Sequence, residues 1–229
     1  MQVSHRFAVS SAVFDDEHLV SCVGLVPVMA LAGQTGLPQL LTDKVFIAEP
    51  RIPSGGAANP APKLSTLIAG MCAGADCIDD LDLVRAGGMP TLFDGVYAPS
   101  TIGTLLREFT FGHARQLESV LREHLTGLCA RVDLLPGSNE RAFLDIDSLL
   151  RPVYGHTKQG ASYGHTKIAG RQILRKGLSP PLITTISTTT SAPVITGARL
   201  RAGKANSGKG AARMIAHAIA TARAAGVTG

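Results

Sequence analysis

The chain has 229 residues, of which 45% are hydrophobic, so it can bury a core in one or two compact domains, and disorder throughout is excluded. Aromatic residues make up 4% and tryptophan is absent, which argues against stacking platforms for single-stranded nucleic acid. The formal net charge of +5 is unevenly distributed. Residues 1–140 contain nine basic and fifteen acidic residues, whereas residues 141–229 contain thirteen basic and two acidic ones.

The first residues and the cysteines predict the compartment. Residues 1–14 lack a charged segment followed by an apolar run of signal-peptide length, and no apolar stretch approaches the roughly 20 residues of a membrane span. The cysteines show neither a C-x-x-C pair nor a histidine at zinc-finger spacing, which predicts buried thiols in a reducing compartment. We therefore expect a cytoplasmic protein without a membrane partner. The cysteines are Cys22, Cys72, Cys77 and Cys129.

Apolar residues at helical spacing predict that most of residues 1–140 is helical. One helix is expected after the Pro/Gly-rich stretch 52–62, and Asp79 or Asp80 is expected to cap a further one. Because the helix dipole favours carboxylates at a helix start, the acidic run there indicates a solvated cap rather than a metal site. The apolar face of the first of these helices comprises Leu64, Leu67, Ile68 and Met71.

Residues 98–128 predict two consecutive helices. Pro99 lies at the start of the first, and Gly112 is expected to separate it from a longer second helix. Two amphipathic helices joined by a short turn are compatible with a helix-turn-helix that binds DNA, and also with a plain helical bundle. If these helices bind DNA, the residues expected to reach its phosphates are Ser100, Thr101 and Arg107.

The turn-rich stretch 133–140 is the predicted domain boundary, because the hydrophobic pattern changes after it. Residues 142–150 alternate as a strand, and residues 182–190 form a β-branched run that also predicts one. Another strand region is expected around Tyr154 and Tyr163. We therefore expect an α/β protein with a helical region over 1–140 and an incomplete α/β domain over 141–229.

The last predicted element is a helix from Gly208 onward. Its polar residues Arg213, His217 and Arg223 are expected to face away from the apolar stripe. The residues of that stripe are Met214, Ile215, Ala218, Ile219 and Ala222.

Asp145 and Asp147 are the two acids of the basic half, and their spacing places both on one face of a strand. Carboxylates kept among many cations are candidate ligands for Mg²⁺, which takes one or two protein carboxylates together with phosphate oxygens. The alternative is a pair of salt-bridged acids at a strand end.

The basic half also contains a short repeat, in which Gly-His-Thr-Lys occurs at residues 155–158 and again at 164–167. Two equivalent strands around a turn explain it, and no third ligand at suitable spacing accompanies His156 and His165 as metal ligands. Lysines and arginines near the repeat are expected to contact DNA phosphates rather than bases, the alternative being a solvated basic face. These residues are Lys158, Lys167, Arg171, Arg175 and Lys176.

Residues 203–210 match most of the phosphate-binding loop G-x-x-x-x-G-K-[ST]. Gly210 departs from it, because glycine offers no hydroxyl to Mg²⁺. A glycine-rich basic loop near a nucleic acid is the better interpretation, and a nucleotide-binding enzyme is the alternative.

In the basic half, residues 144–148, the two Gly-His-Thr-Lys stretches and Gly170 occur together. The acidic half contains Gly70-Met71-Cys72-Ala73-Gly74-Ala75-Asp76, Ile78-Asp79-Asp80, Ala98-Pro99-Ser100-Thr101 and Phe111-Gly112-His113. In combination, these motifs resemble the DDE transposases of bacterial insertion sequences, most closely the thirteen-eighty family. The resemblance covers nearly the whole chain.

This resemblance implies that the basic half is an incomplete ribonuclease H-like domain containing the first strands and first helix. In the family, three acids bind two divalent ions, Mg²⁺ or Mn²⁺, for DNA strand cleavage and transfer. The first acid lies on the first strand, which makes Asp147 the candidate and Asp145 the alternative. The implied partner is double-stranded DNA at the terminal inverted repeats, bound at the nucleoid and compatible with a homo-oligomer on DNA.

The basic half departs from the family pattern in one respect. No Asp or Glu follows Asp147, so the second and third acids are missing, and we expect a truncated transposase that is inactive alone. The alternative is a non-catalytic nucleic-acid-binding protein that uses the basic half as an electrostatic surface.

Overall fold

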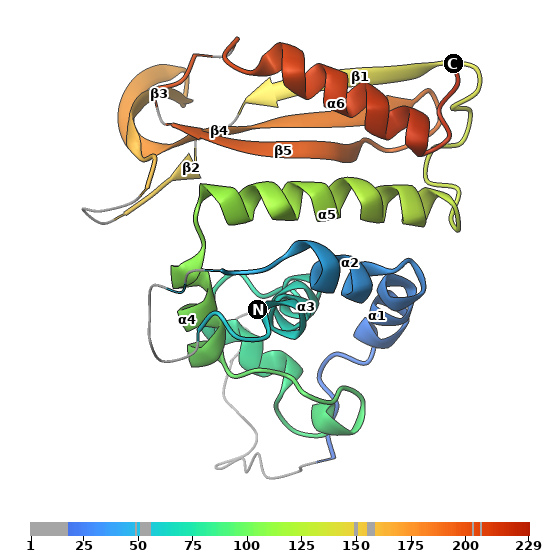
Figure 1. The fold of residues 1–229 in the computed structure, drawn as a ribbon, viewed down its shortest axis with the longest axis vertical. Coiled ribbons are helices and arrows are strands. Elements are labelled where there is room, and N and C mark those ends of the chain that lie inside the picture. Colours follow the sequence, from blue (N-terminus) through green and yellow to red (C-terminus); the bar gives the residue numbers. More distant parts are fainter. Residues whose placement is uncertain are drawn as a thin grey trace, which may run out of the picture.

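The computed structural model describes residues 18–48, 50, 56–148, 151–154, 159–202, 204–206 and 208–229. It shows a mixed α/β protein in which a group of helices precedes a five-stranded antiparallel sheet (Figure 1). The helices are α1 (Leu25–Gln34), α2 (Leu37–Lys44), α3 (Pro60–Cys72), η1 (Asp79–Val84), η2 (Met89–Thr91), α4 (Pro99–Glu108), α5 (Phe111–Cys129) and α6 (Ala211–Ala224). The strands are β1 (Ala142–Ser148), β2 (Arg151–Pro152), β3 (Ser162–Ile168), β4 (Arg171–Thr188) and β5 (Val194–Ala202).

The helical region is built around apolar residues of α2, α3, α4 and α5. Leu41 and Leu105 are fully buried in this core, and Leu64 and Val120 pack with them. Prolines in the first turns of α2, α3 and α4 suit these helix starts, because those backbone positions have no intrahelical acceptor to lose. Within the described residues, none of the helices combines the length and apolar character needed to cross a bilayer.

Two helix boundaries differ from the sequence prediction. Gly112 lies inside α5 rather than before it, because a capping box formed by Thr110 and His113 starts this helix one residue earlier. The helix predicted near Asp79 is the short 3₁₀ helix η1, and neither acid caps it as expected. Instead, Asp80 Oδ2 accepts the backbone N–H groups of Asp76 and Cys77, each at 3.1 Å, in the turn before η1.

Some predictions of burial were also wrong. Met71 is 63% exposed, because it lies in the last turn of α3, beyond the part of the helix in which Leu64, seven positions earlier on the same face, is buried. Cys72 and Cys77 are exposed rather than buried, whereas Cys22 and Cys129 are partly buried. Burial raises the pKa of the Cys129 thiol.

Strand β4 organises the sheet, because it pairs antiparallel with each of the other described strands. Its second part, residues 182–188, lies between β1 and β5, and its first part pairs with β3 and β2. The predicted strand over 182–190 is therefore the end of a longer strand that begins at Arg171. A strand region was predicted around two tyrosines. Tyr163 lies in β3, but Tyr154 lies outside the described strands.

The helices α6 and α5 cover different parts of the sheet (Figure 1). Helix α6 lies on the face that contains Leu182 and Ile186, and its own residues Met214 and Ala218 are buried against the sheet. Helix α5 packs against β5 and also contacts α2, so it lies between the sheet and the helical region. It is thus covered on two sides, and the two regions predicted as separate domains share this helix as their interface.

Candidate metal and nucleic-acid site

Asp145 and Asp147 lie on β1 and share the sheet face opposite α6. Phe143, Asp145 and Asp147 are exposed, while Leu144 and Ile146 are partly buried on the α6 side, which confirms the predicted alternation. The two acids lie opposite Thr185 and Ile183 of β4, and they are separated by about 6.6 Å along the strand. Two exposed carboxylates at this spacing can each offer an oxygen to a divalent cation.

Within the described residues, the structure brings no third acid to this pair. Among the described residues, the group of three potential ligands that lie close together is Asp76, Cys77 and Asp80, in the helical region. Hydrogen bonds from the Cys77 side chain and from the backbone of Cys77 and Asp76 lower the pKa of Asp80. These contacts stabilise the turn, so the Asp80 carboxylate already has a structural role.

The predicted basic residues gather on the β3–β4 hairpin. Arg171 and Arg175 are exposed on the first part of β4, and Lys176 is partly buried opposite Tyr163. Lys167 lies in β3 opposite Gln172, whereas Lys158 and His156 lie outside the described residues. Ile183, the partner of Asp147, lies eight positions after Arg175 in β4, which is about 26 Å along the strand. The hairpin and the acid pair are thus two separate parts of the sheet.

The residues predicted to reach phosphates from the acidic half lie elsewhere. Ser100, Thr101 and Arg107 belong to α4, which lies on the other side of α5 from the sheet (Figure 1). Arg107 is exposed and donates a hydrogen bond from Nη2 to Thr104 Oγ1 at 3.2 Å. Since α5 is packed between two layers, it is not available as the groove-binding helix of a helix-turn-helix.

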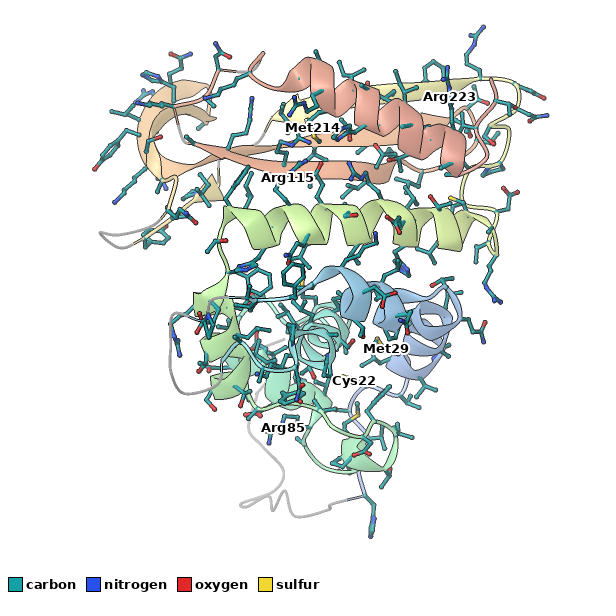
Figure 2. All side chains as sticks on the ribbon, in the orientation of Figure 1. Cys22, Met29, Arg85, Arg115, Met214 and Arg223 are labelled. Carbon is teal, nitrogen blue, oxygen red and sulfur yellow. The ribbon has the colours of Figure 1, made fainter. Side chains whose placement is uncertain are left out.

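A buried ion cluster that the sequence analysis missed joins α5 to β5 and α6. The carboxylate of Glu118, whose side chain is 2% exposed, pairs with Arg115 and lies 3.0 Å from Nη2 of Arg199 and 3.7 Å from Nη1 of Arg122. Figure 2 shows Arg115 between α5 and β5. A cavity of about 330 Å³ lies beside it, lined in part by Arg115, Glu118 and Arg199. The sequence did not predict this cluster, because the spacing of Arg115, Glu118 and Arg122 is also that of a solvated helix face. The remaining arginine, Arg199, is distant in sequence.

His217 completes this cluster and corrects a prediction. It was expected to face away from the apolar stripe of α6, but its Nδ1 accepts hydrogen bonds from Arg122 Nη1 at 2.9 Å and Arg199 Nη2 at 3.3 Å. Burial, followed by the charges of Arg122 and Arg199, lowers the pKa of His217, although Glu118 opposes this shift. A neutral imidazole that accepts from two guanidinium groups fits this arrangement.

The glycine-rich loop between β5 and α6 is held by the protein itself. Arg201 Nη1 donates to the carbonyl oxygens of Asn206 and Lys209, each at 2.8 Å. The backbone N–H of Lys209 donates to Asn206 Oδ1 at 2.9 Å. Because a phosphate-binding loop directs its N–H groups at the ligand, these contacts do not favour the nucleotide-binding alternative. Gly203 and Ser207 lie outside the described residues.

Comparisons of this chain with protein-family models, with curated proteins and with solved structures find no match.

Proposed function

We propose that the chain is a DNA-binding part of an insertion-sequence DDE transposase, in which Asp147 and Asp145 are carboxylates for a divalent cation. The observation that carries the proposal is the position of this acid pair on β1. The pair lies on the first strand of the sheet, on an exposed face, and the strands precede helix α6, which is compatible with the first strands and first helix that the resemblance implies. The mixed α/β fold is observed, and the ribonuclease H-like identity is proposed.

The oxygen donors present suit Mg²⁺ or Mn²⁺, which prefer carboxylates and phosphate oxygens. Such an ion would activate a water or a DNA 3′-hydroxyl and stabilise charge on the scissile phosphate. Asp147 and Asp145 would position the ion, and the basic hairpin would hold the DNA. Since no acid follows Asp147 in the sequence, the chain supplies too few carboxylates on this half to clamp two ions. We therefore expect DNA binding without independent cleavage.

The cation site can be tested by titrating the chain with Mn²⁺ and recording the paramagnetic resonance signal of the free ion. We expect the Asp145→Asn and Asp147→Asn variants to bind Mn²⁺ more weakly than the wild type. The matched control is Asp133→Asn, which removes one exposed acid from the connection between α5 and β1. Equal Mn²⁺ binding by all four proteins would contradict a role for the β1 carboxylates.

DNA binding can be tested with fluorescent duplexes that carry the terminal inverted repeats of an insertion sequence or a scrambled sequence. The transposase proposal predicts a preference for the repeat and no Mg²⁺-dependent cleavage by the chain alone. Cleavage that the Asp147→Ala variant abolishes would contradict the second expectation.

The second candidate function is a non-catalytic nucleic-acid-binding protein. This function is favoured by the distance between the basic residues and the acid pair. Arg175 and the partner of Asp147 lie about 26 Å apart along β4, so the cations do not surround the acids. It predicts equal affinity for all duplexes and no effect of Mn²⁺ on binding. Both candidates predict affinity that falls with added salt, so the preference for repeat sequences decides between them.

A further inference from the structure

We propose that the β3–β4 hairpin is a two-stranded ribbon that lies in the major groove of duplex DNA, with the face of Arg171 and Arg175 toward the bases. This inference rests on the proposed function only for the choice of DNA as the ligand. It adds the element that binds, the groove that it enters and the face that it presents.

The first observation is that the hairpin projects beyond the rest of the sheet. Six residue pairs, from Tyr163–Lys176 to Ile168–Arg171, join β3 to β4 with no other described strand beside them, and the Lys176 carbonyl also accepts the N–H of Val153 at 3.3 Å. The strands β2 and β5 pair with β4 only from Gly177 onward. The ribbon therefore extends by about 20 Å with both outer edges unpaired by the described strands. It lies at the end of the sheet remote from the C-terminus (Figure 1).

The second observation is that both faces of the ribbon are open. Residues 171–175 are all exposed, although successive side chains of a strand point to opposite faces. Tyr163 and Leu174 lie on the face opposite Arg171 and Arg175, and they are 63% and 55% exposed. No described helix or loop buries β4 here, so the ribbon is accessible to a large ligand.

The third observation is a compact tip. Ala169 and Gly170 form the two-residue connection between the paired Ile168 and Arg171, and their φ angles are 48° and 78°. A type I′ turn requires positive φ at both central residues, and its twist matches that of the flanking strands. A hairpin closed in this way is narrow at its end, as insertion into a groove requires.

The charge and size of the ribbon select the ligand. Its register places Arg171, Ile173 and Arg175 on one face, with the two arginines about 13 Å apart along the strand. No acid occurs after Asp147, so nothing on this ribbon repels phosphates. The major groove is about 12 Å wide and admits a two-stranded ribbon. Arginine there makes bidentate hydrogen bonds to guanine O6 and N7, and Ile173 offers an apolar contact to a thymine methyl group.

The test compares two double variants that remove the same charge from opposite ends of the sheet. Arg171→Ala/Arg175→Ala changes the ribbon, and Arg131→Ala/Arg141→Ala changes two exposed arginines near the start of β1. The probe is a short fluorescent duplex of mixed sequence at low salt. We expect the ribbon variant to lose about tenfold or more in affinity and the control to lose less. Circular dichroism checks that both variants fold.

Methylation of guanine N7 reports the groove, because this atom lies in the major groove. We expect it to weaken binding of the wild type but not the residual binding of the ribbon variant. Arg171→Lys/Arg175→Lys keeps the charge and loses the bidentate geometry, so we expect partial affinity without sensitivity to methylation.

The outcomes separate this inference from the proposed function. If the wild type binds duplex and both alanine double variants bind equally, the ribbon is not the contact and only the inference fails. Binding that is insensitive to N7 methylation also overturns the inference. If the wild type binds no duplex at low salt, the proposed function fails as well. A ribbon variant that binds DNA normally but no longer self-associates would assign the hairpin to a protein contact and overturn the groove assignment.

Discussion

Arg199 of β5 donates a hydrogen bond from Nη2 to Oε1 of Glu118 of α5 at 3.0 Å, and so connects the sheet to the helix beside it. Glu118 is the acid of a buried cluster in which Arg115 and Arg122 also surround the carboxylate. Without Glu118, these guanidinium groups would repel one another at the interface of the two regions.

The variant Glu118→Gln should therefore lower the free energy of unfolding by about 3 kcal/mol, because it leaves arginines without their buried counterion. Urea denaturation followed by circular dichroism measures this loss. The control is Glu123→Gln on the same helix, whose pair with Lys44 is 52% exposed at the carboxylate and should contribute less than about 1 kcal/mol. Equal losses in the two variants would contradict the structural role of the cluster.

The pKa of His217 is below its usual 6.5, mainly because of burial and then because of Arg122 and Arg199. Arg115 adds to the lowering, and Glu118 opposes it. The unfolded chain then binds the proton more readily than the folded one, so stability is fully present above pH 6.5 and is lost as pH falls from there through the folded pKa.

The melting temperature should therefore decrease between neutral pH and about pH 5. It should decrease less in His217→Gln, which has no proton to gain at this position. His124, whose pKa burial also lowers, contributes in the same direction and is unchanged in this variant. A His217→Gln protein with the full wild-type pH dependence would show that His217 does not couple folding to protonation.

Two helical glycines should respond to alanine in opposite ways. A Cβ at Gly70 of α3 would meet Cδ2 of the fully buried Leu81, so Gly70→Ala should destabilise the protein by about 1–3 kcal/mol. A Cβ at Gly33 of α1 would meet nothing within 4 Å. Gly33→Ala should stabilise the protein by about 0.5–1 kcal/mol, since alanine favours the helix. Thermal unfolding of both variants checks these signs.

Ala169 has a φ of 48°, which is unfavourable for a residue with a Cβ. Replacing it with asparagine creates an Asn-Gly pair, the preferred sequence for a type I′ turn. Ala169→Asn should therefore stabilise the hairpin, by about 1 kcal/mol, and increase the protection of its amides from hydrogen exchange. Gly170→Ala is the opposite change, and it should reduce this protection. No change in amide protection for either variant would contradict the turn assignment.

The sequence predicted the elements whose periodicity is strong. The alternation at Asp145 and Asp147 located β1 and its exposed face, and Pro99 located the start of α4. Strand β4 was predicted only from residue 182, because its first part has polar and basic residues on both faces. A strand that projects from the sheet buries neither face, so it lacks the pattern that reports burial.

The ion cluster around Glu118 was not predicted, for a different reason. On a helix, Arg115, Glu118 and Arg122 have the spacing of surface ion pairs, and nothing local distinguishes a buried set from a solvated one. The partners that bury it, Arg199 and His217, are 81 and 99 positions away in the chain. Only the packing of α5 against β5 and α6 brings them together.

The position of β4 also has a consequence for folding during synthesis. Every pairing in the described sheet includes β4, so β1 has no partner until residues 182–188 leave the ribosome. The helical core formed by α2, α3, α4 and α5 emerges earlier and can pack first. The apolar side of β1 is exposed in this interval, and the nascent chain should then depend most on chaperones. The order of assembly thus follows from one strand that comes late in the chain.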